Sequence, residues 1–392
     1  MKRYKPDCVR PWQGSPAFPA ESFSLLRMPS VRKYASVRWV SFAAVFVVIA
    51  SLGCVHTEEF RDSDGRVIPA SIATMELVTI GGLPQSVWFR GMDRRNPAVI
   101  LLHGGPGASE SALVRHYDAD LERYFVMVYW EQRGAGRSYR SDIPRDSMTM
   151  AQFEQDLDEV VDLTRQRFGK ERIILLAHSW GTVPGTIYAS RHPDKVAAYV
   201  GVAQIADFAE GQRVSHEWAI AQAAQRNEPA ALSELAAMGA LPRTVDEELA
   251  LGRWTERFGG VFHGDLSTGT LILAALSTDE ANLVDLVKFG QGNRFSLESL
   301  RPEYSKVNLT AYRLFKVPMF FLLGRYDWHV PSVLAERYFQ LLDTPCARLV
   351  WFEQSAHHPP FEEPGRFVRV LRDEVRPIAE GITDCRDKNT GK

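Results

Sequence analysis

The feature that most constrains this chain is residues 173–182, with the sequence I-I-L-L-A-H-S-W-G-T. Its first four residues are large and apolar and predict a strand buried on both faces, and the residues after it predict a helix. A serine between small residues at such a junction is typical of a nucleophile elbow. The tight turn requires small neighbours, which Gly181 provides fully and Ala177 provides with one methyl group. We therefore expect Ser179 to be a nucleophile.

Strands and helices are predicted to alternate on both sides of this stretch. Residues 150–168 carry apolar side chains at helical spacing before Gly169, a typical helix stop. Such alternation favours an α/β fold in which a mostly parallel central sheet is covered by helices on both faces. The segments predicted as strands are a hairpin at 75–80 and 86–90, followed by 98–102, 125–130, 173–176, 197–202, 317–323 and 347–352.

A glycine-rich turn, H-G-G-P-G at residues 103–107, directly follows one of these predicted strands. Glycines let backbone N–H groups approach a ligand closely. In acyl transfer such groups bind the oxyanion of the tetrahedral intermediate, and each donor is worth about 3 kcal/mol. We expect the backbone N–H groups of Gly105 and Trp180 to form this oxyanion hole. The alternative is that the glycines only make a sharp turn.

An acid and a base follow two later strands. Asp327 comes just after residues 317–323, and His357 comes just after residues 347–352. The carboxyl ends of parallel strands share one edge of the sheet. Ser179, Asp327 and His357 also occur in the order expected of a hydrolase with a nucleophile elbow. We expect His357 to take the serine proton and Asp327 to fix the histidine tautomer, rather than both being surface charges.

Three motifs occur in sequence: H-G-G-P-G at 103–107, E-Q-R-G-A-G-R-S at 131–138 and H-S-W-G at 178–181. Together they resemble the proline iminopeptidase family of α/β-hydrolases, which has H-G-G-P-G, D-Q-R-G-x-G-x-S and G-x-S-W-G in this order. The resemblance covers residues 75–204 and 317–376. It implies the α/β-hydrolase fold.

Two departures from the family pattern are plain. Glu131 replaces the usual aspartate, and Ala177 replaces the first glycine of the elbow. The first is a structural ion-pair position and the second a packing position, so neither removes a catalytic group. The family pattern places the base directly after a small residue, here Ala356, and this favours His357 over His358.

The resemblance also implies an inserted helical cap, which we assign to residues 206–314. It would divide the core into residues 55–205 and 315–380. In the iminopeptidases the cap supplies acidic residues that hold the free amino group of the substrate, and Glu210 and Glu217 are the candidates here. An ammonium taken into an apolar pocket requires a carboxylate partner. The alternative is that both glutamates lie on a solvated helix face.

The sequence therefore predicts a serine hydrolase that acts through an acyl-enzyme on a peptide or small acyl substrate. The resemblance favours an aminopeptidase that releases N-terminal residues, and the alternative is an ester or amide hydrolase with a small-molecule substrate. A third possibility is an inactive binding protein, against which the complete triad argues. No cofactor is expected, no Cys/His spacing indicates a metal site, and a net charge of −2 gives no reason to expect nucleic acid.

The N-terminus predicts export. Residues 1–30 are expected to be a disordered leader, and residues 31–54 a signal peptide. A basic patch precedes an uncharged run that ends in S-L-G-C, which resembles a bacterial lipobox with Cys54 as the lipidated residue. The alternative is an uncleaved signal anchor. The basic, apolar and cleavage regions fall at ordinary distances when counted from Met28, so we expect that Met28 is the true initiator or that residues 1–27 are dispensable. Either form places the protein on the membrane, outside the cytoplasm.

An exported chain allows a disulfide. With Cys8 removed and Cys54 lipidated, Cys346 and Cys385 remain to pair and to tie down a C-terminal tail at residues 381–392. Cys346 opens the last predicted strand, and Cys385 follows the last helix, which returns to the same end of the sheet. The alternative is two unrelated free thiols.

Overall fold

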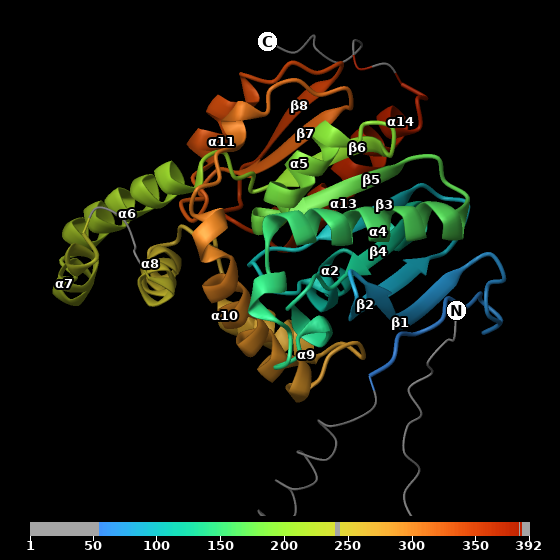
Figure 1. The fold of residues 1–392 in the computed structure, drawn as a ribbon, viewed down its shortest axis with the longest axis horizontal. Coiled ribbons are helices and arrows are strands. Elements are labelled where there is room, and N and C mark those ends of the chain that lie inside the picture. Colours follow the sequence, from blue (N-terminus) through green and yellow to red (C-terminus); the bar gives the residue numbers. More distant parts are fainter. Residues whose placement is uncertain (1–54, 240–243, 384, 386–392) are drawn as a thin grey trace, which may run out of the picture.

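The computed structural model describes residues 55–239, 244–383 and 385 (Figure 1). The expected leader, signal peptide and lipidated Cys54 lie outside the described residues. Within the described ranges no helix has both the length and the apolar character needed to cross a membrane.

An eight-stranded sheet forms the centre of the molecule, in the order β1-β2-β4-β3-β5-β6-β7-β8. The β1–β2 and β2–β4 pairs are antiparallel, and every pair from β4 to β8 is parallel. The strands are β1 (Ile72–Ile80), β2 (Leu83–Gly91), β3 (Ala98–Leu102), β4 (Val126–Trp130), β5 (Ile173–His178), β6 (Val196–Val202), β7 (Met319–Gly324) and β8 (Ala347–Phe352).

The central strands are buried on both faces because successive side chains point to opposite sides of a sheet. In β5, Leu175 and Ala177 join one apolar cluster, while Ile174 and Leu176 join the other. Helices cover both clusters, as the sequence predicted for a mostly parallel sheet. One face carries α4 (Met150–Phe168), α5 (Thr182–Arg191) and α11 (Ser332–Phe339); the other carries α2 (Ser111–Tyr117), α3 (Leu121–Tyr124), α12 (Pro359–Glu362), α13 (Pro364–Val370) and α14 (Arg376–Ala379).

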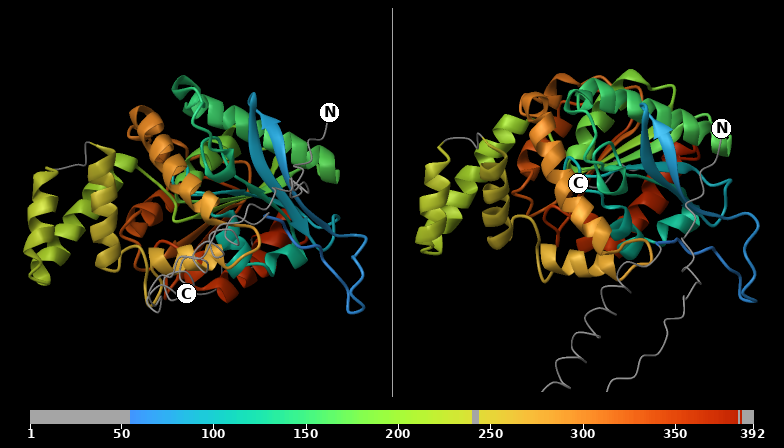
Figure 2. Two further views of the ribbon diagram at one scale, coloured as in Figure 1. Left: turned by 90° about the horizontal axis from the view of Figure 1, so that it is seen from below. Right: turned by 60° about the horizontal axis from the view of Figure 1, so that its bottom comes forward.

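Among the described residues between β6 and β7, five helices are inserted, within the residue range assigned to the cap. Figures 1 and 2 show α6, α7 and α8 projecting to one side of the sheet, while α9 and α10 run beside the core. The projecting helices have an apolar cluster of their own, which includes Ala219, Leu235 and Leu251. The inserted helices are α6 (Phe208–Gln225), α7 (Pro229–Ala237), α8 (Val245–Arg257), α9 (Thr268–Leu276) and α10 (Leu283–Tyr304).

Short helical turns complete the chain. They are η1 (Gly136–Ser138), η2 (Arg145–Ser147), η3 (Ser179–Gly181), η4 (Leu309–Ala311) and the π-turn η5 (Leu371–Val375).

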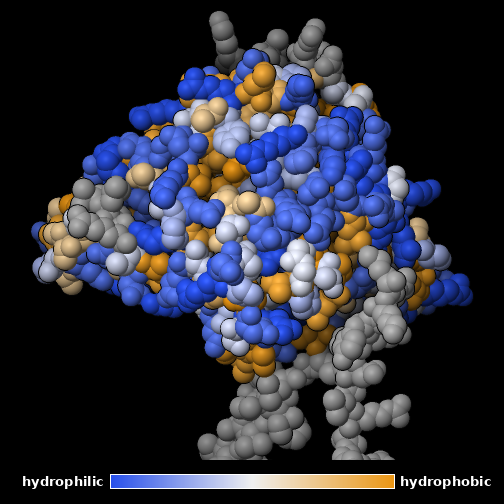
Figure 3. Space-filling model, viewed as in Figure 1, coloured by the Kyte–Doolittle hydropathy of each residue, from blue (hydrophilic) through white to orange (hydrophobic). Residues whose placement is uncertain are grey.

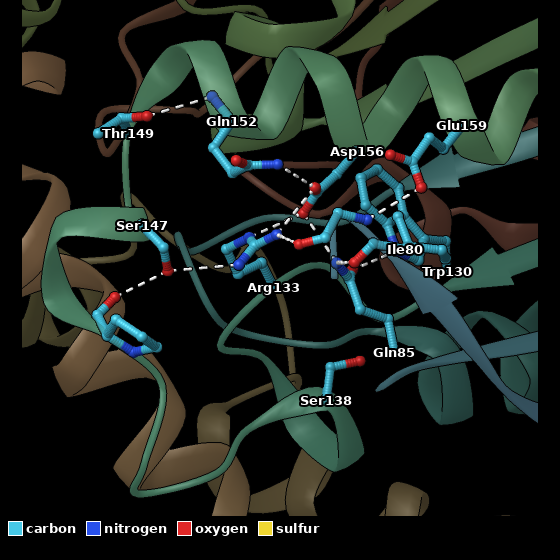
Figure 4. A network of polar contacts seen from close by, with 12 residues as sticks. Ile80, Gln85, Trp130, Arg133, Ser138, Ser147, Thr149, Gln152, Asp156 and Glu159 are labelled. Atoms are coloured by element: carbon cyan, nitrogen blue, oxygen red, sulfur yellow. Dashed lines mark hydrogen bonds and ion pairs between the residues drawn. The ribbon is translucent and has the colours of Figure 1, made fainter. Parts of the chain in front are cut away.

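A buried ion pair fixes the loop that follows β4. Arg133 Nε and Nη2 each lie 2.9 Å from a carboxylate oxygen of Asp156 on α4 (Figure 4). Both side chains are fully buried, and Arg133 also donates to the carbonyl oxygen of Gly81 in the β1–β2 turn. Because a buried charge left without its partner is costly, this pair locks the E-Q-R-G-A-G-R-S loop to the core.

Cys346 and Cys385 form a disulfide, the pair considered from the sequence, with Cα atoms 5.5 Å apart. The bridge joins the residue directly before β8 to the segment that follows α14 (Arg376–Ala379). Arg348 supports it by donating from Nη2 to the carbonyl oxygen of Cys385 over 2.7 Å.

Candidate active site

Ser179 lies at the sharp turn between β5 and α5. Its φ of 50° is in the left-handed region, which costs a non-glycine residue on the order of 1–3 kcal/mol. A Cβ on Gly181 would lie 2.0 Å from the carbonyl oxygen of Leu102, so only glycine fits at that position. The sequence requirement for small residues around the serine thus reflects direct contact with the neighbouring strand.

Asp327 and His357 are in direct contact. Asp327 Oδ2 lies 2.9 Å from His357 Nδ1, and both residues are only 3% exposed. The other carboxylate oxygen, Oδ1, accepts from the backbone N–H groups of His329 and Val330 at 2.9 and 2.8 Å. The carboxylate is therefore fixed at both oxygens, and it orients the imidazole through Nδ1.

Burial controls the protonation of this pair. It raises the pKa of Asp327 to about 7, although two backbone N–H groups and His329 pull that pKa down. It lowers the pKa of His357 well below the usual value, and the nearby rings of His329 and His178 lower it further. His357 is thus a neutral imidazole near pH 7, as a general base requires.

Ser179 and His357 line the same cavity. No hydrogen bond joins their side chains in the described structure, but the ring of His178, next to the serine, is 5.0 Å from the ring of His357. Such contacts commonly tighten only when substrate is bound. The structure thus brings all three predicted triad residues to one site.

The predicted oxyanion donors lie at the same site. Gly105 has φ of 116°, and its N–H has no partner among the described residues, whereas the N–H of Gly104 donates to Glu110. Trp180 is in the first turn of η3, where N–H groups lack an intrahelical acceptor. Gly105 and Trp180 both line the cavity.

Side chains from all three sequence motifs interlock beneath this site. His103 Nε2 accepts from the backbone N–H of Gln132 at 3.0 Å, and Gln132 Nε2 donates back to the carbonyl oxygen of His103. Trp180 Nε1 donates to Gln132 Oε1 over 3.2 Å. The motifs are therefore linked by direct contacts that fix the glycine-rich turn against the elbow.

A cavity of about 590 Å³ opens above the triad. Its lining is mostly apolar and comes from both the core and the inserted helices, including Val261, Phe262, Leu271, Leu286 and Phe289. The size suits a small molecule or the end of a peptide.

The segment between α8 and α9 is bonded to both catalytic loops. The carbonyl oxygen of Gly260 accepts from the N–H groups of Trp328 and His329, and that of Val261 accepts from the N–H of His357. Trp218 of α6 stacks on Trp328 at a ring separation of 5.4 Å. The inserted helices therefore help to position the acid and the base.

Glu210 and Glu217, which the sequence suggested would hold the amino group of the substrate, do not lie where they could do so. Both carboxylates are paired with Arg213 on the outer face of α6, with side chains 39% and 61% exposed, and neither lines the cavity. They lie three and four residues from Arg213, which is the spacing of ion pairs along a helix. This spacing could have indicated from the sequence that both glutamates lie on a solvated helix face.

Sequence reasoning missed the acids that do line the cavity. On α8, Glu248 is bonded to Arg301 and Tyr304, whereas Glu256 accepts, within the part of the chain that the structure describes, from the N–H and hydroxyl of Thr268. Glu110, at the start of α2, also lines the cavity, as do Glu131, Asp207, Glu280 and Asp285.

His329 and His358 flank the base, at ring separations of 4.8 and 4.9 Å from His357. Within the described residues, Glu110, His178 and His358 are the one group whose ligand atoms, all within 4.8 Å of one another, could hold a metal ion. Both ring nitrogens of His178 already face oxygen acceptors, so a metal ion would have to break one of those contacts.

Residues 97–364 match the family model for the alpha/beta hydrolase fold. The chain belongs to the α/β-hydrolase family. This hydrolase is 32% identical over 310 residues to a probable aminopeptidase, YbaC, of Bacillus subtilis, a match that covers 78% of this chain and 97% of the relative. It is 26% identical over 283 residues to a proline iminopeptidase of Heyndrickxia coagulans, covering 71% and 91%. The resemblance drawn from the motifs is confirmed.

Solved structures show the same fold. A proline iminopeptidase-related protein of Thermus thermophilus has a TM-score of 0.57 at 21% identity, covering 79% of this hydrolase and 99% of that chain. A proline iminopeptidase of Mycobacterium smegmatis has a TM-score of 0.57 at 17% identity, covering 80% and 100%.

Proposed function

We propose that this hydrolase is a serine aminopeptidase that releases N-terminal residues, proline among them, through an acyl-enzyme. The observation that carries the proposal is the buried contact between Asp327 and His357 at the cavity that contains Ser179. A serine hydroxyl becomes a useful nucleophile only when a base takes its proton.

In the acylation step, His357 Nε2 takes the proton of Ser179 as Oγ attacks the scissile carbonyl carbon. The carbonyl oxygen gains negative charge, which the N–H groups of Gly105 and Trp180 stabilise. His357 then protonates the leaving amine, and an acyl-serine remains. Asp327 stabilises the imidazolium during this step because it accepts from Nδ1.

Deacylation reverses the roles. His357 takes a proton from water, the resulting hydroxide attacks the acyl-serine, and the same oxyanion donors act again. The serine leaves with the proton returned by His357. The inserted helices, which we propose act as a cap, limit the access of bulk water to this step.

The aminopeptidase assignment is supported by the relatives and by Glu256. The relative that matches over nearly its whole length is named a probable aminopeptidase. A free amino terminus in an apolar cavity requires a carboxylate. Glu256 lines the cavity, and among the described residues it accepts from the neutral groups of Thr268, so its charge is available to an ammonium, whereas Arg301 neutralises Glu248.

A parallel assay on prolyl and other aminoacyl amides and on short acyl esters, with Ser179→Ala as control, tests the proposal. Amide turnover that is lost in Ser179→Ala supports it. Glu256→Gln should raise KM for free-amine substrates and leave N-acetylated analogues unaffected. Glu217→Gln on the solvent face is the matched control and should change neither.

The alternative is a carboxylic-ester or amide hydrolase on the same triad. The apolar lining around Leu271, Leu286 and Phe289 favours this alternative because it would accept an uncharged acyl chain. Ester turnover without amide turnover, together with an unchanged KM in Glu256→Gln, would select it.

We also propose that the protein is exported and held at the membrane through residues 31–54, by lipid on Cys54 or by an uncleaved anchor. The apolar run that ends in S-L-G-C supports this proposal. Metabolic labelling with palmitate, compared between the natural chain and Cys54→Ala, distinguishes the two forms. Recovery of the full chain in the soluble fraction would contradict both.

A further inference from the structure

A buried glutamate and histidine link the three loops of the active site. Glu110 Oε1 lies 2.7 Å from His178 Nδ1, and both residues are buried. The other carboxylate oxygen, Oε2, accepts from the N–H of Gly104 at 3.1 Å. On its far side, His178 Nε2 lies 2.9 Å from the carbonyl oxygen of His357. The glycine-rich turn, the elbow and the base loop are thus joined through one chain of contacts.

The acceptors define the protonation of His178. A backbone carbonyl oxygen only accepts, so Nε2 must carry a hydrogen. Nδ1 faces a carboxylate oxygen, and with Glu110 ionised it carries the second hydrogen, which makes the ring an imidazolium. Burial alone would lower the pKa of His178, but the Glu110 carboxylate and the carbonyl oxygen of His357 raise it above the ordinary value.

The position of this charge matters for catalysis. A Cβ placed on Gly104 would lie 3.1 Å from Glu110 Oε1 and 3.4 Å from the Cβ of Ser179, so the carboxylate lies close to the nucleophile. An uncompensated negative charge there would oppose the oxyanion that forms on the substrate. The imidazolium of His178 cancels that charge.

We propose that Glu110 and His178 are a buried positioning pair that holds the oxyanion turn and the His357 loop in register with Ser179. The inference rests on the proposed serine mechanism. Neither residue transfers a proton to substrate. Glu110 fixes Gly104 and so aims the adjacent N–H of Gly105, while His178 holds the backbone of His357.

The test measures the rate at which a fluorophosphonate labels Ser179, because this reaction uses the same nucleophile, base and oxyanion donors without requiring the natural substrate. Glu110→Ala should slow labelling about 100-fold, since misplacement by about 1 Å costs this much. Glu110→Gln, which still accepts from Gly104, should recover part of the rate. Asp118→Asn, a buried carboxyl at the end of the same helix α2, is the matched control and should label at the natural rate.

A second measurement keeps the inference testable if a variant folds poorly. The ¹⁵N spectrum of the natural protein should show both ring nitrogens of His178 protonated at pH 7, and Glu110→Gln should make one of them unprotonated. This change would show that Glu110 holds His178 in its charged form.

Two results overturn the inference. If the natural protein labels at Ser179 and Glu110→Ala labels equally fast, or if His178 is neutral in the natural protein, the positioning role is wrong and the proposed function stands. If the natural protein does not label at all, the proposed function itself fails and this inference fails with it.

Discussion

His357 Nδ1 lies 2.9 Å from Asp327 Oδ2, although the two residues are 30 positions apart and follow different strands. The contact exists because β7 and β8 are parallel neighbours whose carboxyl ends share one edge of the sheet. With Nδ1 facing Asp327, Nε2 is the ring nitrogen left to take a proton, and His357 lines the same cavity as Ser179. The fold thus prepares the base before any substrate is present.

Activity should rise with pH through about 7. The active form requires an ionised Asp327 and a neutral His357, and burial raises the pKa of Asp327 to about 7 while it lowers that of His357. Protonation of the pair at lower pH therefore removes the base. The rate of Ser179 labelling, measured from pH 5 to 9, should fall on the acid side, and a rate that is constant over this range would contradict the assignment.

Gly181→Ala should abolish the elbow. The new Cβ would lie 2.0 Å from the backbone oxygen of Leu102, which cannot move aside, so we expect a loss of stability on the order of 4 kcal/mol or more. Gly290→Ala on α10 is the control, because nothing lies within 4 Å of its Cβ and alanine favours a helix by about 1 kcal/mol. Urea unfolding should show a lower midpoint for Gly181→Ala and a higher midpoint for Gly290→Ala than for the natural protein. Equal midpoints for the two variants would refute the packing argument.

Asp118→Asn should stabilise the protein at neutral pH. Both carboxylate oxygens of Asp118 are buried without a hydrogen-bond partner in the described structure, and burial raises its pKa well above the usual value. The folded state therefore holds a proton that the unfolded state loses above about pH 4, so stability falls as pH rises from there.

The gain from Asp118→Asn should accordingly be about 1–3 kcal/mol at pH 8 and vanish near pH 3. Thermal unfolding at both pH values measures this gain. Asp120→Asn, at an exposed neighbouring position, should show no such pH dependence. A gain that is larger at pH 3 than at pH 8 would show that the carboxyl is not the cause.

Reduction of the disulfide should destabilise the fold without affecting the site. Cys346 and Cys385 are 39 residues apart, and closing such a loop is worth up to about 4 kcal/mol. Dithiothreitol should lower the unfolding temperature of the natural protein but not that of a Cys346→Ala, Cys385→Ala variant, while Ser179 labelling stays unchanged. Two thiols detected without reductant would mean that the bridge does not form.

The core was predictable because its signals are local. The sequence predicts a helix at 150–168, and α4 has these bounds, since Thr149 caps its start and Gly169 adopts φ of 62° at its end. The strands of the β1–β2 hairpin are longer than predicted, because the pairing continues to Ile72 and Gly91 at one end and to Ile80 and Leu83 at the other. Because Ser179, Asp327 and His357 each follow a predicted parallel strand, the sequence also predicted that they lie at the carboxyl edge of the sheet.

The polar contacts around the site were not predictable in the same way. Glu110 and His178 are 68 residues apart, and only the folded sheet brings them together. Which acidic residues line the cavity depends on which face of each inserted helix turns toward it. Helical spacing alone does not define that face. For Glu210 and Glu217, the spacing to Arg213 indicated pairing along the helix.

The most direct test of the account is a fluorophosphonate reaction followed by mass spectrometry of the peptides. The account predicts one adduct, on Ser179, that is absent in Ser179→Ala and forms at least about 100-fold more slowly in His357→Gln. An adduct on another residue, or equal labelling in His357→Gln, would contradict the claim that a histidine aligned by Asp327 activates this serine.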